Sequence, residues 1–245
     1  MFDNQRRPRV ILLRKTERQD ETGQLVQMKT EHRTHDKFKF EQALVRGGLR
    51  CIAGVDEAGR GPIAGPVVAA AVVLPTTWVS TGLPAQLAGL TDSKQLTPRQ
   101  RDAYFELLTA VYKVRFAIAQ VEAHTIDKVN ILRATHIAMA AAVAKLEPPP
   151  EHVLVDGGFV PTITLPQTPI IKGDALSFSI AAASVIAKVT RDRLMLEYDR
   201  LWPEYGFARH KGYGTPKHLA ALGRYGPCPI HRQTFAPVRF SAPPK

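Results

Sequence analysis

The chain has 245 residues, of which 44% are hydrophobic, so it is long enough to bury one large core. Its formal charge of +11 at pH 7 favours a polyanionic partner such as nucleic acid, although general solubility would also account for it. No apolar stretch is long enough to span a membrane, and two distant cysteines, Cys51 and Cys228, argue against a disulfide framework or a CxxC zinc site. We therefore expect a cytoplasmic protein without a membrane partner.

The positive charge is distributed unevenly along the chain. Residues 1–36 contain eight Lys/Arg and six Asp/Glu with no sustained periodicity, which predicts a flexible basic N-terminal extension. Residues 199–245 contain eight basic and two acidic residues, a net charge of +6, so the strongest positive field is expected at the C-terminal end. We predict one folded domain over 37–245, which includes this basic C-terminal segment.

The hydrophobic pattern predicts alternating helices and strands after the extension. In chain order, we expect a helix at 38–46, strands at 50–56 and 66–74, a helix at 96–112, a strand at 113–121, a helix at 129–146, strands at 152–156 and 168–174, and a helix at 175–202. Two initial strands followed by strand–helix alternation predict an α/β fold with a mixed sheet.

Some of these elements carry specific local signals. Thr97 is a suitable N-cap residue, and Pro98 occupies the first helical position after it. The long helix at 175–202 begins with many small residues, which permit close packing on a sheet. Residues 75–89 are expected to form an enlarged surface loop.

Carboxylates follow three of the predicted strands. Asp56 and Glu57 end the first strand, Asp156 ends "VLVD", and Asp174 precedes the long helix. Each has an ordinary explanation as a turn, capping or surface residue. The carboxyl ends of strands in open α/β sheets form sites, however, and converging acids repel each other unless a cation neutralises them. We therefore predict a Mg²⁺ or Mn²⁺ site in an enzyme that acts on phosphodiesters.

The motifs around these acids resemble those of one known family. "GVDEAGRGPIAGPVVAAAVVL", "TDSKQL", "VLVDGG", "KGDALSFSIAAASVIAKVTRDRLM", "HKGYGTPKH" and "GPCPIHRQTFAPV" occur in the order typical of bacterial ribonuclease HII, over residues 38–238. The resemblance implies an RNase H-like fold with a five-stranded mixed sheet flanked by helices and followed by a C-terminal helical segment. It also implies hydrolysis of RNA in RNA–DNA hybrids and incision of duplex DNA 5′ of single embedded ribonucleotides. Such cleavage leaves a 3′-hydroxyl and a 5′-phosphate and serves ribonucleotide excision repair and primer removal.

The same resemblance assigns roles to individual residues. Two divalent ions would be held by four acids, which are Asp56, Glu57, Asp156 and Asp174. If the turn "EAGRG" ends the first strand, both adjacent acids can reach the metal. The 2′-hydroxyl would be read by the turn of Gly59, Arg60 and Gly61, and Tyr213 would contact the RNA–DNA junction; an ordinary tight turn and a surface aromatic are the alternatives.

Basic residues near these motifs are candidate phosphate contacts. Lys94 and Lys172 lie in matched motifs beside the acids, whereas Lys188 and Arg191 are expected on a solvated helix face. We expect the duplex backbone to follow a C-terminal cluster made of Arg209, Lys211, Lys217 and Arg224. His210 and His231 are expected to be structural or to face phosphate rather than to bind metal.

Two other functions remain open at this point. Ribonuclease HIII shares the fold and acids but carries a large N-terminal domain, for which 36 residues are too few, and it lacks the arginine of the turn. A non-catalytic hybrid-binding module would gain nothing from four clustered acids facing phosphates. We expect a monomer, and whether it engages a sliding clamp stays open.

Overall fold

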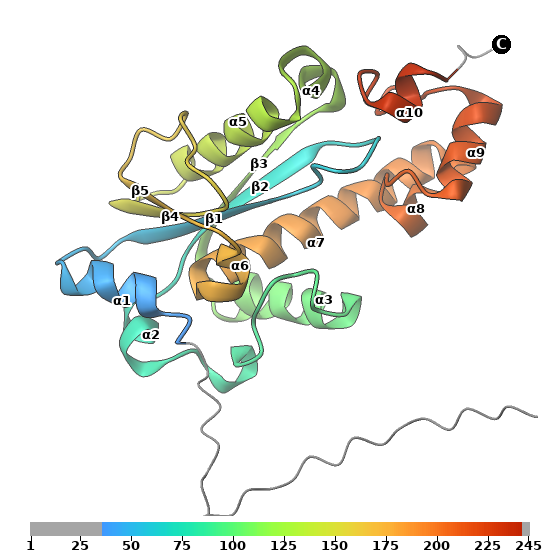
Figure 1. The fold of residues 1–245 in the computed structure, drawn as a ribbon. Coiled ribbons are helices and arrows are strands. Elements are labelled where there is room, and N and C mark those ends of the chain that lie inside the picture. Colours follow the sequence, from blue (N-terminus) through green and yellow to red (C-terminus); the bar gives the residue numbers. More distant parts are fainter. Residues whose placement is uncertain (1–35, 242–245) are drawn as a thin grey trace, which may run out of the picture. The chain divides into compact units, whose positions relative to one another are not determined.

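The computed structural model describes residues 36–241 and contains five strands (Figure 1). The extension expected over 1–36 therefore lies outside the described residues, except for Asp36. The strands are β1 (Ile52–Ala58), β2 (Val67–Val73), β3 (Arg115–Val121), β4 (His152–Asp156) and β5 (Gln167–Ile170). The α-helices are α1 (Lys39–Arg46), α2 (Thr76–Thr81), α3 (Pro98–Glu106), α4 (Ala123–Val129), α5 (Ile131–Ala144), α6 (Gly173–Leu176), α7 (Phe178–Leu201), α8 (Phe207–His210), α9 (Pro216–Tyr225) and α10 (Ala236–Arg239).

The strands form one mixed sheet, as expected, in the order β3-β2-β1-β4-β5. β1 pairs antiparallel with β2, and β2 pairs antiparallel with β3. β1 pairs parallel with β4, and β4 pairs parallel with β5. The carboxyl ends of β1, β4 and β5 therefore lie at one edge of the sheet, which brings the predicted acids together.

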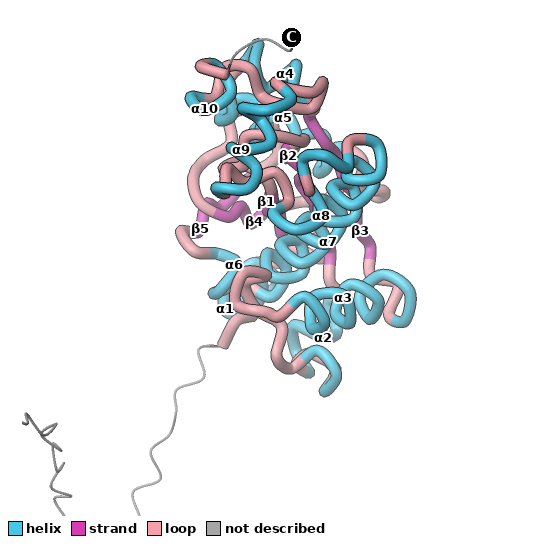
Figure 2. Tube along the Cα trace, turned by 90° about the vertical axis from the view of Figure 1, so that its right-hand side faces the viewer, coloured by secondary structure: helices cyan, strands magenta, loops and turns pink. Residues whose placement is uncertain are grey.

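Helices cover both faces of this sheet (Figures 1 and 2). α5 packs on one face and α7 on the other, and each face has its own buried apolar cluster. The contact between β1 and α7 is very close, because a Cβ atom placed on Gly54 would lie 2.3 Å from the backbone carbon of Ser179. A larger residue at position 54 would push α7 away from the sheet.

Two expectations about helices were wrong. Residues 75–89 do not form a surface loop: they form α2 and a 3₁₀ turn (Ala85–Leu87), because the side chains of Val79 and Leu87 are buried in the core on the α7 face. The helix expected at 175–202 is preceded by a separate helix, α6. The break occurs at Ser177, whose side chain caps α7 by accepting from the Ile180 amide.

The helix expected at 96–112 begins as predicted and ends differently. Thr97 and Gln100 form a capping box at its start, and Pro98 is its first residue. After Glu106 it continues as a π-helical turn over Leu107–Val111. The C-terminal helical segment implied by the resemblance is formed by α8, α9 and α10. Within residues 36–241, no helix is both long and apolar enough to cross a bilayer.

Candidate active site

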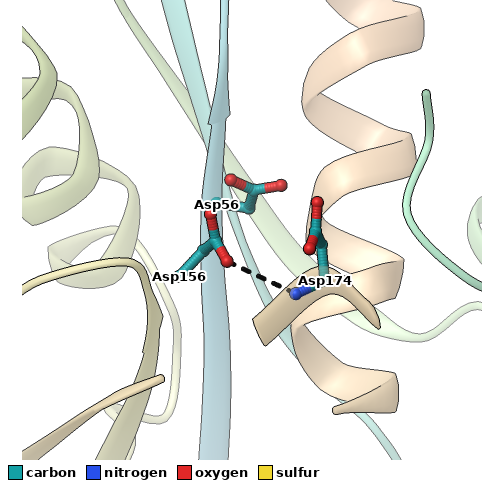
Figure 3. Close-up of side chains that lie close together, drawn as sticks. All are labelled: Asp56, Asp156 and Asp174. Atoms are coloured by element: carbon teal, nitrogen blue, oxygen red, sulfur yellow. Dashed lines mark hydrogen bonds between the residues drawn. The ribbon is translucent and has the colours of Figure 1, made fainter. Parts of the chain in front are cut away.

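Three aspartates meet at the carboxyl edge of the sheet. Asp56 lies on β1, Asp156 ends β4, and Asp174 lies on α6, just after β5. One carboxylate oxygen from each lies within 4.8 Å of the other two (Figure 3). Asp56 and Asp174 are buried, with 4% and 8% exposure, and Asp156 is partly buried.

Backbone amides fix the orientation of these carboxylates. Asp156 Oδ1 accepts a hydrogen bond from the Gly173 amide at 2.7 Å. It also accepts one from the Asp174 amide at 3.4 Å (Figure 3). Asp56 Oδ1 accepts from the amide of Glu57 at 2.7 Å. Asp156 therefore ties the end of β4 to the start of α6, and this contact places Asp174 opposite Asp56.

Glu57 is not part of this group of three. β1 ends at Ala58, inside the "EAGRG" segment but after Glu57, so strand alternation still points Asp56 and Glu57 to opposite faces of the sheet. The Glu57 carboxylate lies 3.4 Å from the Arg60 guanidinium in a partly exposed ion pair. The negative charge of Asp156 still acts to raise the pKa of Glu57, so Glu57 lies near the site without joining the three aspartates.

The electrostatics of the cluster favour a bound cation. Burial, followed by repulsion from Glu57 and Asp156, raises the pKa of Asp56 well above its usual value. Burial and the charges of Asp156 and Asp92 raise the pKa of Asp174 to about 6. A divalent ion with oxygen ligands would relieve this repulsion, and carboxylate oxygens are the ligands that Mg²⁺ and Mn²⁺ prefer. The residues therefore fit a metal centre.

A cavity of about 490 Å³ opens beside the acids and carries basic side chains on its wall. Burial works to lower the pKa of Lys94, but the charges of Asp56, Asp92 and Asp174 outweigh it and raise that pKa. Lys188 also lines the cavity and donates to Asp192 at 2.7 Å. A second cavity of about 330 Å³ shares Glu57 and Arg60 with the first and is also lined by Asp156 and Phe159.

The turn after β1 and Tyr213 lie side by side at the same cavity. Gly59, Arg60, Gly61 and Tyr213 all line it, and the Tyr213 side chain is 47% exposed. A Cβ atom placed on Gly61 would lie 3.5 Å from Tyr213 Cε1. The two candidate recognition elements are thus neighbours although the chain separates them widely.

Two buried arginines support this turn, and neither of them was predicted from the sequence to do so. Arg191 is 1% exposed, so its expected place on a solvated helix face was wrong; it donates to the carbonyls of Ala64, Pro66 and Lys211. Arg232 is fully buried and donates to the carbonyls of Gly59, Arg60 and Gly65. The only sequence signal was their place inside motifs that contain other functional residues.

Gly59 cannot carry a side chain at this position. Its φ is +101°, and a Cβ atom there would lie 2.1 Å from the Nε of Arg191. The glycine is therefore required both by its backbone conformation and by the buried guanidinium behind it.

The remaining candidates have simpler surroundings. His210 and His231 are structural, as expected: His210 bonds the Tyr205 carbonyl at 2.9 Å, and His231 is buried against His218. Lys172 is exposed, in a left-handed backbone conformation directly before α6. In the C-terminal basic cluster, Arg209, Lys217 and Arg224 are exposed, whereas Lys211 donates to the Ala208 carbonyl.

The family model and the curated relatives point to one family. A family model described as Ribonuclease HII matches residues 53–240. A ribonuclease HII from Geobacillus kaustophilus is 53% identical over 240 residues, covering 95% of this chain and 89% of that protein. Ribonuclease H2 from Pyrococcus horikoshii OT3 superimposes with a TM-score of 0.62 and 30% identity, over 77% of this chain and 95% of that one. RNase HII from a PCNA complex of Archaeoglobus fulgidus shares the fold, with a TM-score of 0.62 and 24% identity over 76% of this chain and 95% of that one.

Proposed function

The chain belongs to the ribonuclease HII family and is a ribonuclease H. From this premise we propose that it incises duplex DNA on the 5′ side of a single embedded ribonucleotide. It also cuts the RNA strand of RNA–DNA hybrids and leaves a 3′-hydroxyl and a 5′-phosphate. The observation that carries this proposal is the placement of three converging aspartates beside an exposed glycine–arginine–glycine turn and Tyr213.

The residues of the site would form two groups, one that binds the phosphate and one that selects the sugar. Asp56, Asp156 and Asp174, with Glu57 beside them, would hold two Mg²⁺ or Mn²⁺ ions. Bound ions supply Lewis-acid chemistry that stabilises the negative charge developing on the phosphoryl oxygens. Lys94 and Lys188, on the wall of the adjoining cavity, attract and orient the phosphodiester backbone.

Sugar selection would occur at the turn and Tyr213. The 2′-hydroxyl is both a donor and an acceptor, and the exposed backbone of Gly59–Gly61 offers groups that can bind it. Tyr213 would pack on the next deoxyribose, where a further 2′-hydroxyl crowds the ring. The two cavities, which share Glu57 and Arg60, would give the strand a path past the acids.

A mapped cleavage assay tests this function. A labelled duplex with one ribonucleotide is incubated with the enzyme in Mg²⁺, in Mn²⁺ and in EDTA, and the product ends are identified. We expect one cut 5′ of the ribonucleotide that EDTA abolishes. A ribonucleotide duplex bound but uncut under all metal conditions would favour the non-catalytic hybrid-binding module instead.

The cellular context is also a proposal. Cleavage at single ribonucleotides suits ribonucleotide excision repair and RNA primer removal in the cytoplasm, by a monomer. The Archaeoglobus fulgidus protein was solved as a complex with PCNA, which motivates a test of clamp binding by gel filtration. Co-elution with the host sliding clamp would support this partner.

A further inference from the structure

The turn that would read the 2′-hydroxyl is shaped from behind by one buried side chain. Arg232 Nη2 lies 2.5 Å from the Gly59 carbonyl oxygen, and Nη1 lies 2.9 Å from that of Arg60. Nε and Nη2 also donate to the Gly65 carbonyl, at 3.0 and 2.9 Å. One guanidinium therefore binds both ends of the loop that joins β1 to β2.

These contacts fix the orientation of two peptide planes. The peptides between Gly59 and Arg60 and between Arg60 and Gly61 are trans, so each carbonyl points opposite to the N–H of the following residue. Because both carbonyls face Arg232, the N–H groups of Arg60 and Gly61 point away from it. Both residues are exposed, and within residues 36–241 neither amide makes a hydrogen bond.

Arg191 joins the same loop to the segment that carries Tyr213. It donates to Ala64 and Pro66 at the end of the loop and to the carbonyl of Lys211, two residues before Tyr213. Neither guanidinium forms an ion pair with a carboxylate in the described part of the chain. Two buried positive charges therefore lie behind this loop, where they favour an electron-rich ligand.

We propose that Arg232 is a positioning residue for 2′-hydroxyl recognition: it holds the Gly59 and Arg60 carbonyls inward so that two free amides face the sugar. The inference rests on the proposed function, in which this turn contacts the ribonucleotide. A lysine cannot replace Arg232, because one ammonium group cannot reproduce the planar fork that binds three carbonyls.

The test measures the preference for one ribonucleotide rather than activity. Dissociation constants for a duplex with a single ribonucleotide and for the same all-DNA duplex are measured by fluorescence anisotropy in EDTA. We expect Arg232→Lys to reduce the wild-type preference roughly five- to tenfold, since about 1 kcal/mol accompanies each lost hydrogen bond. Binding of the all-DNA duplex should change little. Arg239→Gln, which removes an exposed C-terminal charge, should weaken both duplexes equally and keep their ratio.

The outcomes separate this inference from the proposed function. If the wild type shows no preference for the ribonucleotide, the proposed function fails; if it does and Arg232→Lys keeps the same ratio, only the positioning role is overturned. Hydrogen exchange on the wild type gives a second measurement that requires no variant to fold. Amides of 60–61 should be protected by saturating ribonucleotide duplex and not by DNA, and equal protection would overturn the proposal.

Discussion

The buried imidazoles of His218 and His231, in the C-terminal helical segment, share one hydrogen bond, with 3.0 Å between their Nε2 atoms. His218 Nδ1 lies 2.9 Å from the Tyr213 carbonyl and must donate to it, so its Nε2 accepts from His231. His231 Nδ1 then accepts from the amide of Cys228 at 3.0 Å. Both rings are therefore neutral, and this chain of hydrogen bonds ends on the backbone of Tyr213.

This pair predicts a loss of stability in acid. Burial, together with the neighbouring imidazoles, lowers the pKa of His218 and of His231 from 6.5 to about 4. Between pH 4 and 6.5 the unfolded chain therefore binds more protons than the folded one. The contribution of these neutral rings to stability is fully present above pH 6.5 and is lost as the pH drops toward 4. A pKa shift of this size corresponds to about 3 kcal/mol in the free energy of unfolding for one imidazole.

Urea unfolding of the wild type and of His218→Gln between pH 4 and 8 checks this. The variant should be less stable at pH 8 and should lose less of its free energy of unfolding on acidification. Parallel pH profiles for the two proteins would contradict the assignment of the two neutral rings.

Asp56→Asn should abolish cleavage and leave binding of the hybrid largely intact, because it removes a proposed metal ligand and not a phosphate contact. About 4 kcal/mol of lost transition-state stabilisation corresponds to roughly a thousandfold slower cleavage. In EDTA the variant should melt at the wild-type temperature or above it, since a buried repelling charge is gone. Mn²⁺ should then stabilise it less than the wild type in a thermal melt.

Asp102→Asn is the matched control for this experiment. Its carboxylate is 64% exposed and lies 4.0 Å from Arg193, so cleavage and the response to Mn²⁺ should both stay normal. Near-normal turnover of Asp56→Asn in Mg²⁺ would remove Asp56 from the metal site.

The N-terminal limit of the domain can be tested at Glu41. This buried carboxylate accepts from the Ser177 hydroxyl at 2.6 Å and from the Ser179 amide at 3.2 Å, which ties α1 to the junction of α6 and α7. Deleting residues 1–34 should leave the cleavage site and thermal stability unchanged, because it keeps Asp36, which accepts from the Phe38 amide directly before α1. Glu41→Ala should destabilise the full chain by about 2–4 kcal/mol, since it unpairs both donors.

Chemical denaturation of the deletion, Glu41→Ala and Glu41→Gln gives the comparison. Glu41→Gln keeps an acceptor oxygen for Ser177 and should retain most of the stability. A deletion of 1–34 that unfolded, or that cut at another nucleotide, would show that the extension belongs to the domain.

Local sequence signals predicted those parts of the fold that depend on neighbouring residues. The Thr97 N-cap and the β1 and β4 strands that end near Asp56 and Asp156 are examples. The break at Ser177 was not predicted, because the small residues around it fit an uninterrupted helix. The three aspartates could be brought together from sequence because the ends of parallel strands share one sheet edge.

The supporting arginines could not be predicted in this way. Arg191 bonds the carbonyl of Pro66, 125 residues away, and Arg232 bonds that of Gly65, 167 residues away. Helical periodicity places Arg191 on α7 but contains no information about carbonyls from a distant loop. Backbone acceptors carry no residue-type signal, so a buried arginine held by them resembles a solvated one in sequence.

Tyr213→Ala should slow cleavage at a single embedded ribonucleotide by roughly ten- to a hundredfold. The ring is 47% exposed beside Gly61, so it is free to pack on a sugar, and an aromatic contact of this kind contributes about 1–3 kcal/mol by analogy with base stacking. Long hybrids should be affected less, because most of their cut sites have no RNA–DNA junction. The measurement is the ratio of the two cleavage rates for each protein, in the same salt and metal.

Matched variants separate this contact from the support of the fold. Phe240→Ala removes another exposed aromatic, 78% exposed at the end of α10, and should leave the ratio unchanged. Tyr213→Phe keeps the ring and should retain most of the preference, because the backbone bonds from His218 and Thr215 to the Tyr213 carbonyl do not involve the hydroxyl. An unchanged ratio in Tyr213→Ala would mean that the ring only packs against the turn and that the junction is recognised elsewhere.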